Sequence, residues 1–314
     1  MTALASEGDV TAALIGAGGS VLAAAPRRAT PAPIASPSYR ALESASVLVE
    51  GPDGTLFFKL MHPEMRGWFD LASGAAVAVA AGAAGVGPRV IRADDGLLLT
   101  EALEEGWRTA TLDRLQEPAV VAGTMTALRR LHSLPATGAR FDAFACIDSY
   151  VAEARQARVP LPHDLGWILA LLDAARPVLL AAPLAVCRND GSASNLMLGP
   201  GGAVMLVDFD RGGMNDPMFD LGVLLAEITD FEADMHAPFL AYAGNWDAAA
   251  FARARLWAVV DDVMHMLWMR LCAARSARTS LEWLKYGEWR LMRARLALHH
   301  PQFEEKLRVA GGQA

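Results

Sequence analysis

Residues 186–210 read VCRNDGSASNLMLGPGGAVMLVDFD, and this stretch decides the fold. Two apolar runs enclose a turn of Gly, Pro, Gly and Gly at 199–202, which predicts a β-hairpin. A loop of small residues before the first strand carries Asp190 and Asn195, and the second strand ends at Asp208. Because a hairpin brings the ends of its two strands together, we expect these three side chains at one edge.

Two carboxylates and an amide oxygen form an all-oxygen donor set. Mg²⁺ prefers such ligands, whereas zinc favours His and Cys. Asp and Asn also make turns at strand ends, so each of the three taken alone is better explained by loop structure. Taken together at this spacing, they favour a magnesium site.

The chain before this hairpin has the pattern of a small strand-rich region. Short strands are predicted at 47–50, 55–60, 90–91 and 97–100, with an Ala-rich helix over 71–84. Residues 22–38 contain four prolines and are expected to form a linker or an extended arm. Beyond residue 104 helices are predicted over 111–133, 164–182, 217–229, 248–275 and 281–298. This order predicts an α+β fold in two lobes, residues 1–103 with the arm and residues 104–314.

Composition excludes several classes of protein. The 314 residues are 53% hydrophobic, so a long disordered chain is ruled out. A net charge of −7 without basic runs argues against nucleic acid as a partner. The cysteines at 146, 187 and 272 are too far apart for a disulfide framework or a Cys-based zinc site, and they fit a reducing cytosol.

Two apolar stretches resemble membrane or export signals without meeting their requirements. Residues 71–88 carry no charge, but they are mostly Ala, Gly and Val, which predicts a buried helix rather than a membrane span. The apolar stretch 10–25 follows Glu7 and Asp9, whereas a secretory signal needs basic residues there. We therefore expect a cytoplasmic protein with no membrane span. Assembly into a homodimer is left as an alternative to a monomer.

The spacing Asp190-x4-Asn195 with a later Asp208 resembles the catalytic loop and metal-binding Asp of the protein-kinase-like phosphotransferases. More narrowly, the chain is similar to the choline/ethanolamine kinase family, a relative of the aminoglycoside phosphotransferases. The matching segments are ND at 189–190, VDFD at 207–210, GMNDPMFDLG at 213–222, RLHSL at 130–134, FDAF at 141–144 and YGEWR at 286–290. The resemblance implies a bilobal kinase-like fold and ATP- and Mg²⁺-dependent phosphorylation of a hydroxyl on a small molecule. Choline, ethanolamine or a similar amino alcohol is the expected acceptor.

The resemblance also implies a role for each matched residue. Asp190 would be the catalytic base or orienter of the acceptor hydroxyl. Asn195 and Asp208 would hold Mg²⁺ and the nucleotide, supported by Asp210. Lys59 would contact the phosphates, and adenine would lie against the segment from Glu101 to Leu103. Asp216 and Asp220 are expected to be structural, with Asp216 capping a helix that begins at Pro217.

The chain departs from the family pattern at three places. Arg188 stands where the family has His, a position that is largely architectural. The expected phosphate-covering loop at 42–46 has no glycine, and the 71–84 helix has no acid. Ala72 or Gly74 occupies the place of the Glu that pairs with the strand Lys. These departures leave open a pseudokinase that binds a nucleotide or a partner, and an aminoglycoside or sugar kinase on the same fold.

Aromatic residues of the last helices are the candidates for the substrate pocket. Choline kinases surround the ammonium with ring faces, which attract cations. Trp268 matches one such position and Tyr286 resembles another, while His265 stands where a second Trp is expected. Trp283 could substitute for the missing ring. The alternative is that these residues form only the core of a helical lobe.

Overall fold

The computed structural model describes residues 5–30, 42–103, 105–278 and 281–312 of the chain. They form two compact units, one of residues 1–139 with 186–214 and one of residues 140–185 with 215–314. The first unit thus takes in the 186–214 segment, which the sequence assigned to the C-terminal lobe, and the lobe boundary at 103 stays a prediction. Among the described residues, no helix has both the length and the apolar character to cross a membrane.

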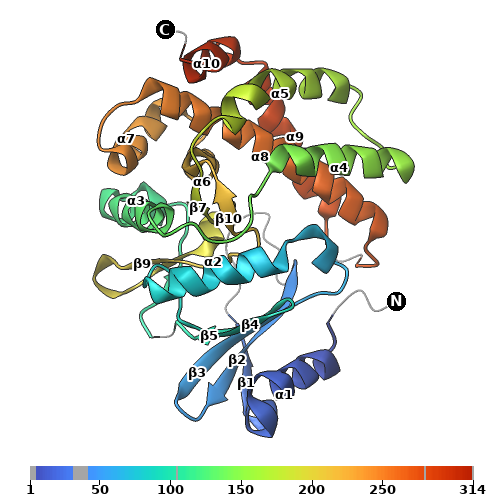
Figure 1. Cartoon of the computed structure of the whole chain (residues 1–314), viewed down its shortest axis with the longest axis vertical. Coiled ribbons are helices and arrows are strands. Elements are labelled where there is room, and N and C mark those ends of the chain that lie inside the picture. The colour runs from blue at the N-terminus through green and yellow to red at the C-terminus, as the bar shows by residue number, and fades with distance from the viewer. Residues whose placement is uncertain (1–4, 31–41, 104, 279–280, 313–314) are drawn as a thin grey trace. The chain divides into compact units, whose positions relative to one another are not determined.

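A five-stranded antiparallel sheet forms the centre of the first unit (Figure 1). Its strands, in the order β1-β2-β3-β5-β4, are β1 (Arg27–Ala29), β2 (Ser44–Gly51), β3 (Gly54–Met61), β5 (Leu97–Glu101) and β4 (Val90–Asp94). In the register of β3 and β5, Phe58 lies opposite Leu99 and Lys59 lies opposite Leu98. The four predicted strands are therefore confirmed as β2 to β5.

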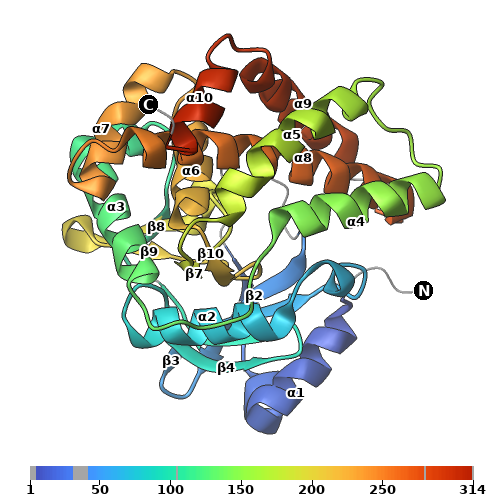
Figure 2. The ribbon, with the colours of Figure 1, turned by 45° about the horizontal axis from the view of Figure 1, so that its top comes forward.

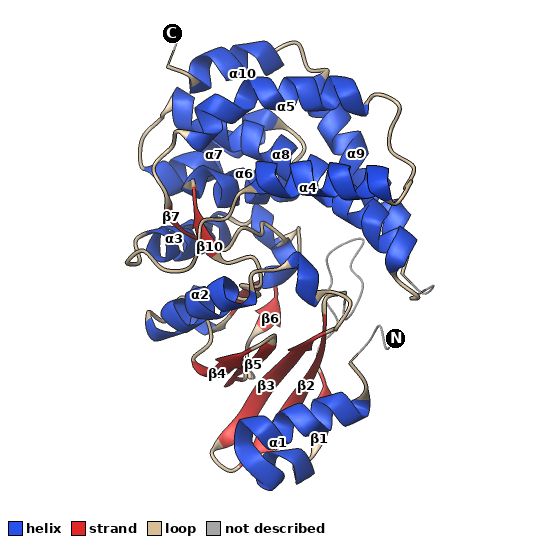
Figure 3. Cartoon of the chain, turned by 45° about the vertical axis from the view of Figure 1, so that its right-hand side comes forward, coloured by secondary structure: helices blue, strands red, loops and turns tan. Residues whose placement is uncertain are grey.

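The two faces of this sheet carry different helices (Figure 3). Because side chains alternate along a strand, Phe58 and Lys59 point to opposite faces. Phe58 packs in a core with Leu14 of α1 (Glu7–Ala24), a helix that begins at a capping box of Ser6 and Asp9. Lys59 lines a pocket with residues of α2 (Leu71–Ala83), the predicted Ala-rich helix. The sheet is thus covered on both sides, and one face directs Lys59 inward.

The predicted hairpin is confirmed as β8 (Leu196–Leu198) and β9 (Val204–Leu206), joined by a 3₁₀ turn at Pro200–Gly202. Gly201 and Gly202 have φ angles of 67° and 81°, a region that glycine enters without steric cost. β6 (Arg108–Thr109) extends this sheet, and α3 (Pro118–His132) packs on β9. β7 (Ala185–Cys187) pairs with β10 (Gly213–Asn215), and the segment between β7 and β8 is the predicted catalytic loop.

The second unit is helical, and its helices surround α8 (Ala248–Arg275), as Figure 2 shows. The others are α4 (Ala143–Gln156), α5 (Leu165–Leu180), α6 (Pro217–Ile228), α7 (Glu232–Ala243), α9 (Trp283–Leu298) and α10 (Phe303–Ala310). Asp216 caps α6 as predicted, since its side chain accepts a hydrogen bond from Met218 N at 3.0 Å. On α6, Gly222 approaches α8 so closely that a Cβ there would lie 1.8 Å from Ala254 O.

The elements confirm an α+β fold and correct some of the predicted boundaries. Within the proposed proline-rich arm, residues 22–24 belong to α1 and residues 27–29 form β1, while residues 31–38 lie outside the described part. The expected phosphate-covering loop at 42–46 is in part a strand, because β2 begins at Ser44. Helices α1, α4, α7 and α10 were not predicted.

Candidate active site

Asp190 lies half-buried in the loop between β7 and the 3₁₀ turn Ala193–Asn195. Its Oδ1 accepts a hydrogen bond from the Ser192 backbone N–H at 2.8 Å. Its Oδ2 accepts a hydrogen bond from the side-chain amide of Asn195. The carboxylate is therefore fixed by two donors from its own loop, and the structure brings Asp190 and Asn195 together as the hairpin argument predicted.

Arg188 fixes the backbone of the same loop. Its guanidinium is fully buried, donating from Nε to Asp190 O at 2.7 Å and from Nη1 to Asn195 O at 2.6 Å. Nη1 also lies 3.3 Å from Val207 O, on the strand side of the hairpin. A planar fork of five donors suits this arrangement of carbonyl groups. Arg188, which the sequence marked only as a departure, therefore ties the loop to the segment that carries Asp208.

Two residues of the site have backbones in the left-handed region. Asn189 has a φ of 57° and Asp208 a φ of 64°. Such conformations cost energy for residues other than glycine and persist where the surroundings impose them. Asn189 is fully buried, and its side-chain amide donates to Arg211 O at 2.8 Å. This bond joins the Asp190 loop to residues 208–213, which we call the metal loop.

Lys59 of β3 reaches the metal loop directly. Its ammonium donates to Asp208 Oδ1 at 2.8 Å and to Asp210 Oδ2 at 2.7 Å. Only 9% of the Lys59 side chain is exposed, against 30% for Asp208 and 20% for Asp210. The family pattern would give this Lys a Glu on α2. Here its partners are the two Asp residues that the sequence assigned to the metal.

Burial and charge act against each other in this cluster. Burial alone would lower the pKa of Lys59, but Asp208 and Asp210 hold it well above its usual range. Burial opposes ionisation of Asp208, yet the charge of Lys59 keeps the pKa of Asp208 below its ordinary value. The pKa of Asp210 rises to about 6 because burial and the neighbouring Asp208 outweigh Lys59. Lys59 and Asp208 are therefore both charged at neutral pH, whereas Asp210 takes up a proton more readily than Asp208.

Glu43, immediately before β2, adds a third carboxyl to this cluster. Burial and the charge of Asp208 raise the pKa of Glu43 to about 8, against the opposing effect of Lys59. Glu43 is therefore mostly protonated at neutral pH. From the sequence, Glu43 and Glu64 are the nearest acids that could replace the missing helix Glu beside Lys59, and the pairing of β2 with β3 accounts for the position of Glu43.

The donor set of the metal loop fits a divalent cation. Asp208 and Asp210 already converge on one positive group, the Lys59 ammonium. Asn195 joins them across the hairpin, where Val207 N donates to Asn195 O at 3.1 Å. Carboxylate and amide oxygens suit Mg²⁺. Asn195 and Asp208 would hold the ion, with Asp210 beside them.

The predicted adenine-binding segment lies at the end of β5. The Glu101 side chain is exposed and pairs with Arg89 at 2.6 Å, so it is directed to its own sheet edge. Leu103 is half-buried, and Ala102 N donates to Thr55 O at 3.1 Å. These contacts fix the backbone of the segment, and the nucleotide roles of Glu101 and Leu103 stay predictions.

Three of the four aromatic candidates in the second unit lie together, and Trp283 lies apart from them. The His265 ring lies edge-on to Trp268, with centroids 5.8 Å apart, and to Tyr286 at 6.4 Å. Trp268 is buried, with 2% of its surface exposed. Trp283 instead faces Arg278, whose guanidinium carbon is 4.9 Å from the ring centre. The structure thus brings together His265, Trp268 and Tyr286.

Arg290, which the sequence did not select, is the central cation of this group. It donates from Nη2 to the Tyr286 hydroxyl at 2.8 Å and from Nη1 to Asp261 at 2.9 Å and Asp262 at 2.7 Å. Its guanidinium carbon also lies 5.2 Å from the centre of the Tyr286 ring. Burial raises the pKa of the Tyr286 hydroxyl to about 12. Two adjacent acids inside the apolar run of α8 were the sequence signal for this network.

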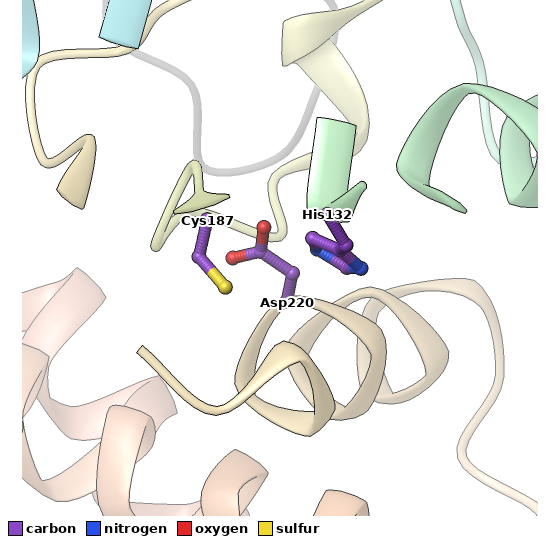
Figure 4. Close-up of side chains that lie close together, drawn as sticks. All are labelled: His132, Cys187 and Asp220. Atoms are coloured by element: carbon purple, nitrogen blue, oxygen red, sulfur yellow. The ribbon is translucent and has the colours of Figure 1, made fainter. Parts of the chain in front are cut away.

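His132 and Cys187 lie close to each other in the first unit, as Figure 4 shows. A ring nitrogen of His132, at the end of α3, and Sγ of Cys187, at the end of β7, are within 4.8 Å. Figure 4 also draws Asp220, which belongs to the second unit. Cys187 is buried beside Arg188, so this contact packs α3 against the strand that leads into the Asp190 loop.

Comparison with known proteins places these observations in a family. The model of the Phosphotransferase enzyme family (APH) matches residues 40–257. A choline/ethanolamine kinase family protein from Mesorhizobium loti has a similar structure, with a TM-score of 0.80 and 23% identity over 97% of this chain and 99% of that one. No curated protein sequence matches the chain.

Two further solved structures have the same fold. An ethanolamine kinase from Plasmodium vivax is 12% identical, with a TM-score of 0.69 over 85% of this chain and 82% of that one. The choline kinase LicA from Streptococcus pneumoniae is 16% identical, with a TM-score of 0.67 over 81% and 93%. These likenesses confirm the expected kinase-like α+β fold. With the family model covering more than half of its residues, the chain belongs to the phosphotransferase enzyme family.

Proposed function

We propose that this protein transfers the γ-phosphoryl group of ATP, with Mg²⁺, to a hydroxyl of a small molecule, with choline, ethanolamine or a similar amino alcohol as the leading acceptor class. The observation that carries the proposal is the fixed Asp190 carboxylate in the loop that leads into the hairpin, after which Asp208 contacts Lys59. An acid for the nucleophile and a cation beside two metal-binding carboxylates are the parts that phosphoryl transfer requires.

In this mechanism Asp190 orients the acceptor hydroxyl and takes its proton as the new oxygen–phosphorus bond forms and the bond to ADP breaks. Ser192 N–H and the Asn195 amide hold the carboxylate in place, which lowers the reorganisation needed at the moment of reaction. Lys59 offsets phosphate charge. Mg²⁺, held by Asn195 and Asp208, would neutralise the charge that develops on the transferred group.

The acceptor class is supported by the solved structures of choline and ethanolamine kinases, whose fold this chain has. We propose that His265, Trp268 and Tyr286 contact the acceptor, because their rings meet within one unit. Trp283 is left out of this group. Arg290 already occupies the face of Tyr286, and this favours a second candidate, a neutral hydroxyl compound such as a sugar.

A binding protein without turnover is the other candidate. It is favoured by the contacts of Lys59, because both its partners are carboxylates that a metal and a nucleotide would need to engage. An active enzyme must loosen at least one of these ion pairs when ATP and Mg²⁺ bind. A pseudokinase would keep both.

Thermal unfolding with ATP, with and without Mg²⁺, followed by an acceptor screen for ADP release, separates these candidates. A ligand at about 100 times its dissociation constant stabilises the fold by roughly 2.7 kcal/mol. We expect Mg²⁺-dependent stabilisation and turnover with one acceptor class. Stabilisation without turnover on amino alcohols, sugars or aminoglycosides would indicate the pseudokinase, and no stabilisation would contradict nucleotide binding.

A further inference from the structure

The N-terminal half of α2 touches the backbone of the metal loop. A Cβ on Gly74 would lie 2.7 Å from Phe209 O and 3.0 Å from Asp210 O, closer than side-chain carbons approach backbone oxygens. Any residue larger than glycine would push the loop or the helix aside. A Glu at position 74 is therefore excluded by space, whereas Ala72, the other place considered for it, is exposed.

Ser73, the preceding residue, joins the same loop to a second segment. Its hydroxyl donates to Gly212 O at 2.7 Å and accepts from Ala139 N at 2.9 Å, and only 6% of the residue is exposed. One hydroxyl thus satisfies two buried backbone groups. Removing it would leave both without this partner, which is costly inside a protein.

Two further contacts extend this surface of α2. A Cβ on Gly212 would lie 2.8 Å from the Val77 Cβ, so the loop glycine permits close packing on the helix. Just before the helix, the Phe69 ring faces the Arg211 guanidinium at 4.8 Å from the ring centre. Metal-loop residues 209 to 212 therefore all meet α2 or the residues that lead into it.

We infer that Ser73, Gly74 and Val77 are positioning residues that hold Asp208 and Asp210 in place through close contact between α2 and the metal loop. This inference rests on the proposed function, because it assigns the positioning of the catalytic metal ligands. In the family pattern a Glu on the helix would pair with Lys59. In this chain the helix instead contacts the backbone of the metal loop, and Lys59 binds both Asp208 and Asp210.

The test compares Gly74→Ala, Ser73→Ala and Ser73→Thr with the wild type. Gly16→Ala is the matched control, because a Cβ on Gly16 of α1 meets no atom within 4 Å. Three readouts are measured on the full chain: hydrogen exchange of residues 208–213, the dissociation constant of Mn²⁺ alone by electron paramagnetic resonance, and kcat and KM for phosphoryl transfer. Thermal unfolding shows which variants are folded.

We expect Gly74→Ala, which displaces the loop backbone, and Ser73→Ala, which removes the buried hydroxyl, to speed exchange in 208–213 and to weaken Mn²⁺ binding by roughly tenfold. Their kcat should fall while the acceptor KM stays within about twofold. Ser73→Thr should stay near the wild type because it keeps the hydroxyl, and Gly16→Ala should change nothing. Folded variants with wild-type exchange in 208–213 and wild-type Mn²⁺ affinity would overturn the inference.

The outcomes keep the two proposals apart. If Gly74→Ala does not fold, the difference between Ser73→Ala and Ser73→Thr decides. If the wild type binds Mn²⁺ but transfers no phosphate, the proposed function fails while exchange and Mn²⁺ affinity still decide on the α2 contact. If the wild type binds no Mn²⁺, faster exchange confined to 208–213 in Ser73→Ala supports the positioning role, and unchanged exchange refutes it.

Discussion

Lys59 combines two roles at the scale of single residues, as a phosphate-binding candidate and as the cation that compensates Asp208 and Asp210. All three side chains are largely removed from water. Removing one partner of a buried ion pair leaves uncompensated charge, which costs more than the pair contributes when intact. The stability of the first unit should therefore depend on Lys59 even when no nucleotide is bound.

Lys59→Met should lower the free energy of unfolding by about 3 kcal/mol, because two partly buried carboxylates lose their cation. Urea unfolding measures this. Mg²⁺ should stabilise the variant more than the wild type, since the ion can replace the missing charge. The control is Lys285→Met, whose exposed pair with Glu282 contributes little. Equal stability of Lys59→Met and the wild type would contradict the buried cluster.

Glu43 should make stability depend on pH in a specific direction. Its pKa is about 8 in the folded chain, against an ordinary value of 4.5, so the folded state binds the proton more tightly. Between these values the unfolded state loses its proton first, and the free energy of unfolding falls as pH rises. Each pKa unit corresponds to about 1.4 kcal/mol.

Glu43→Gln should therefore gain stability relative to the wild type as pH rises from 5 to 8, and little should change below pH 4.5. Urea unfolding of both proteins at pH 4.5, 6.5 and 8.5 checks this. The difference between the two proteins matters, because other groups titrate in both. A difference that is constant across this range would show that Glu43 is not buried beside Asp208.

At the scale of elements, the β8–β9 hairpin depends on a residue outside both strands. Arg188 holds the backbone carbonyls of Asp190, Asn195 and Val207 with one guanidinium. A Lys ammonium cannot reach several carbonyls in a plane, although it keeps the charge.

Arg188→Lys should therefore loosen the Asp190 loop, lowering kcat at least tenfold and the free energy of unfolding by about 1–3 kcal/mol. Steady-state kinetics and urea unfolding measure these effects. Arg176→Lys is a suitable comparison, because that residue makes a bidentate pair with Asp148 on the more exposed surface of α4 and α5. If both substitutions have the same small effect, the loop is held by other contacts.

Elements with a strong hydrophobic periodicity could be predicted from the sequence, whereas elements with a weak periodicity could not. Strands β2 to β5 alternate or carry β-branched residues between Gly and Pro turns, and α8 was predicted with its observed ends. Helix α1 was not predicted because it contains three glycines in its last half and lacks a marked apolar face. Its capping box at Ser6 and Asp9 was the available signal.

The residues of the candidate site also fall into those that the sequence predicted and those that it did not. Asp190, Asn195 and Asp208 flank the β8–β9 hairpin, so the side-chain bond from Asn195 to Asp190 and the backbone bond from Val207 to Asn195 followed from local pattern. Glu43 and Gly74 come from segments far away in the chain, and their positions depend on strand register and on helix packing. The sequence offered Glu43 only as one of two nearby acids and Gly74 only as a place where the helix Glu is missing, and it held no local signal for their contacts with the metal loop. The ion pairs of Lys59 with both Asp residues likewise follow from three-dimensional proximity.

At the scale of the whole molecule, the residues proposed for ATP and Mg²⁺ belong to one compact unit and those proposed for the acceptor to the other. Each unit has its own buried charges. In the second unit, Arg290 with Asp261 and Asp262 forms an ion cluster inside a helical core. The acceptor residues can therefore be tested without disturbing the Lys59 cluster.

Trp268→Ala should raise the KM for choline about five- to thirtyfold more than the KM for ATP, from loss of about 1–2 kcal/mol of cation–π contact. Leu271→Ala, in the core of the same helix, is the control, because it lowers stability without removing a ring. Kinetics with each substrate and thermal unfolding measure both effects. If the two variants behave alike, Trp268 only packs the core.

The most direct test follows γ-labelled ATP into an acceptor, with Mg²⁺, for the wild type and for Asp190→Asn. The panel contains choline, ethanolamine, a sugar and an aminoglycoside. The wild type should phosphorylate one acceptor class, and the variant should be slower by a factor of about 10²–10⁴ while ATP still stabilises it, because Asp190 serves the nucleophile. Equal transfer by both proteins, or no transfer and no stabilisation by ATP in the wild type, would contradict the assignment.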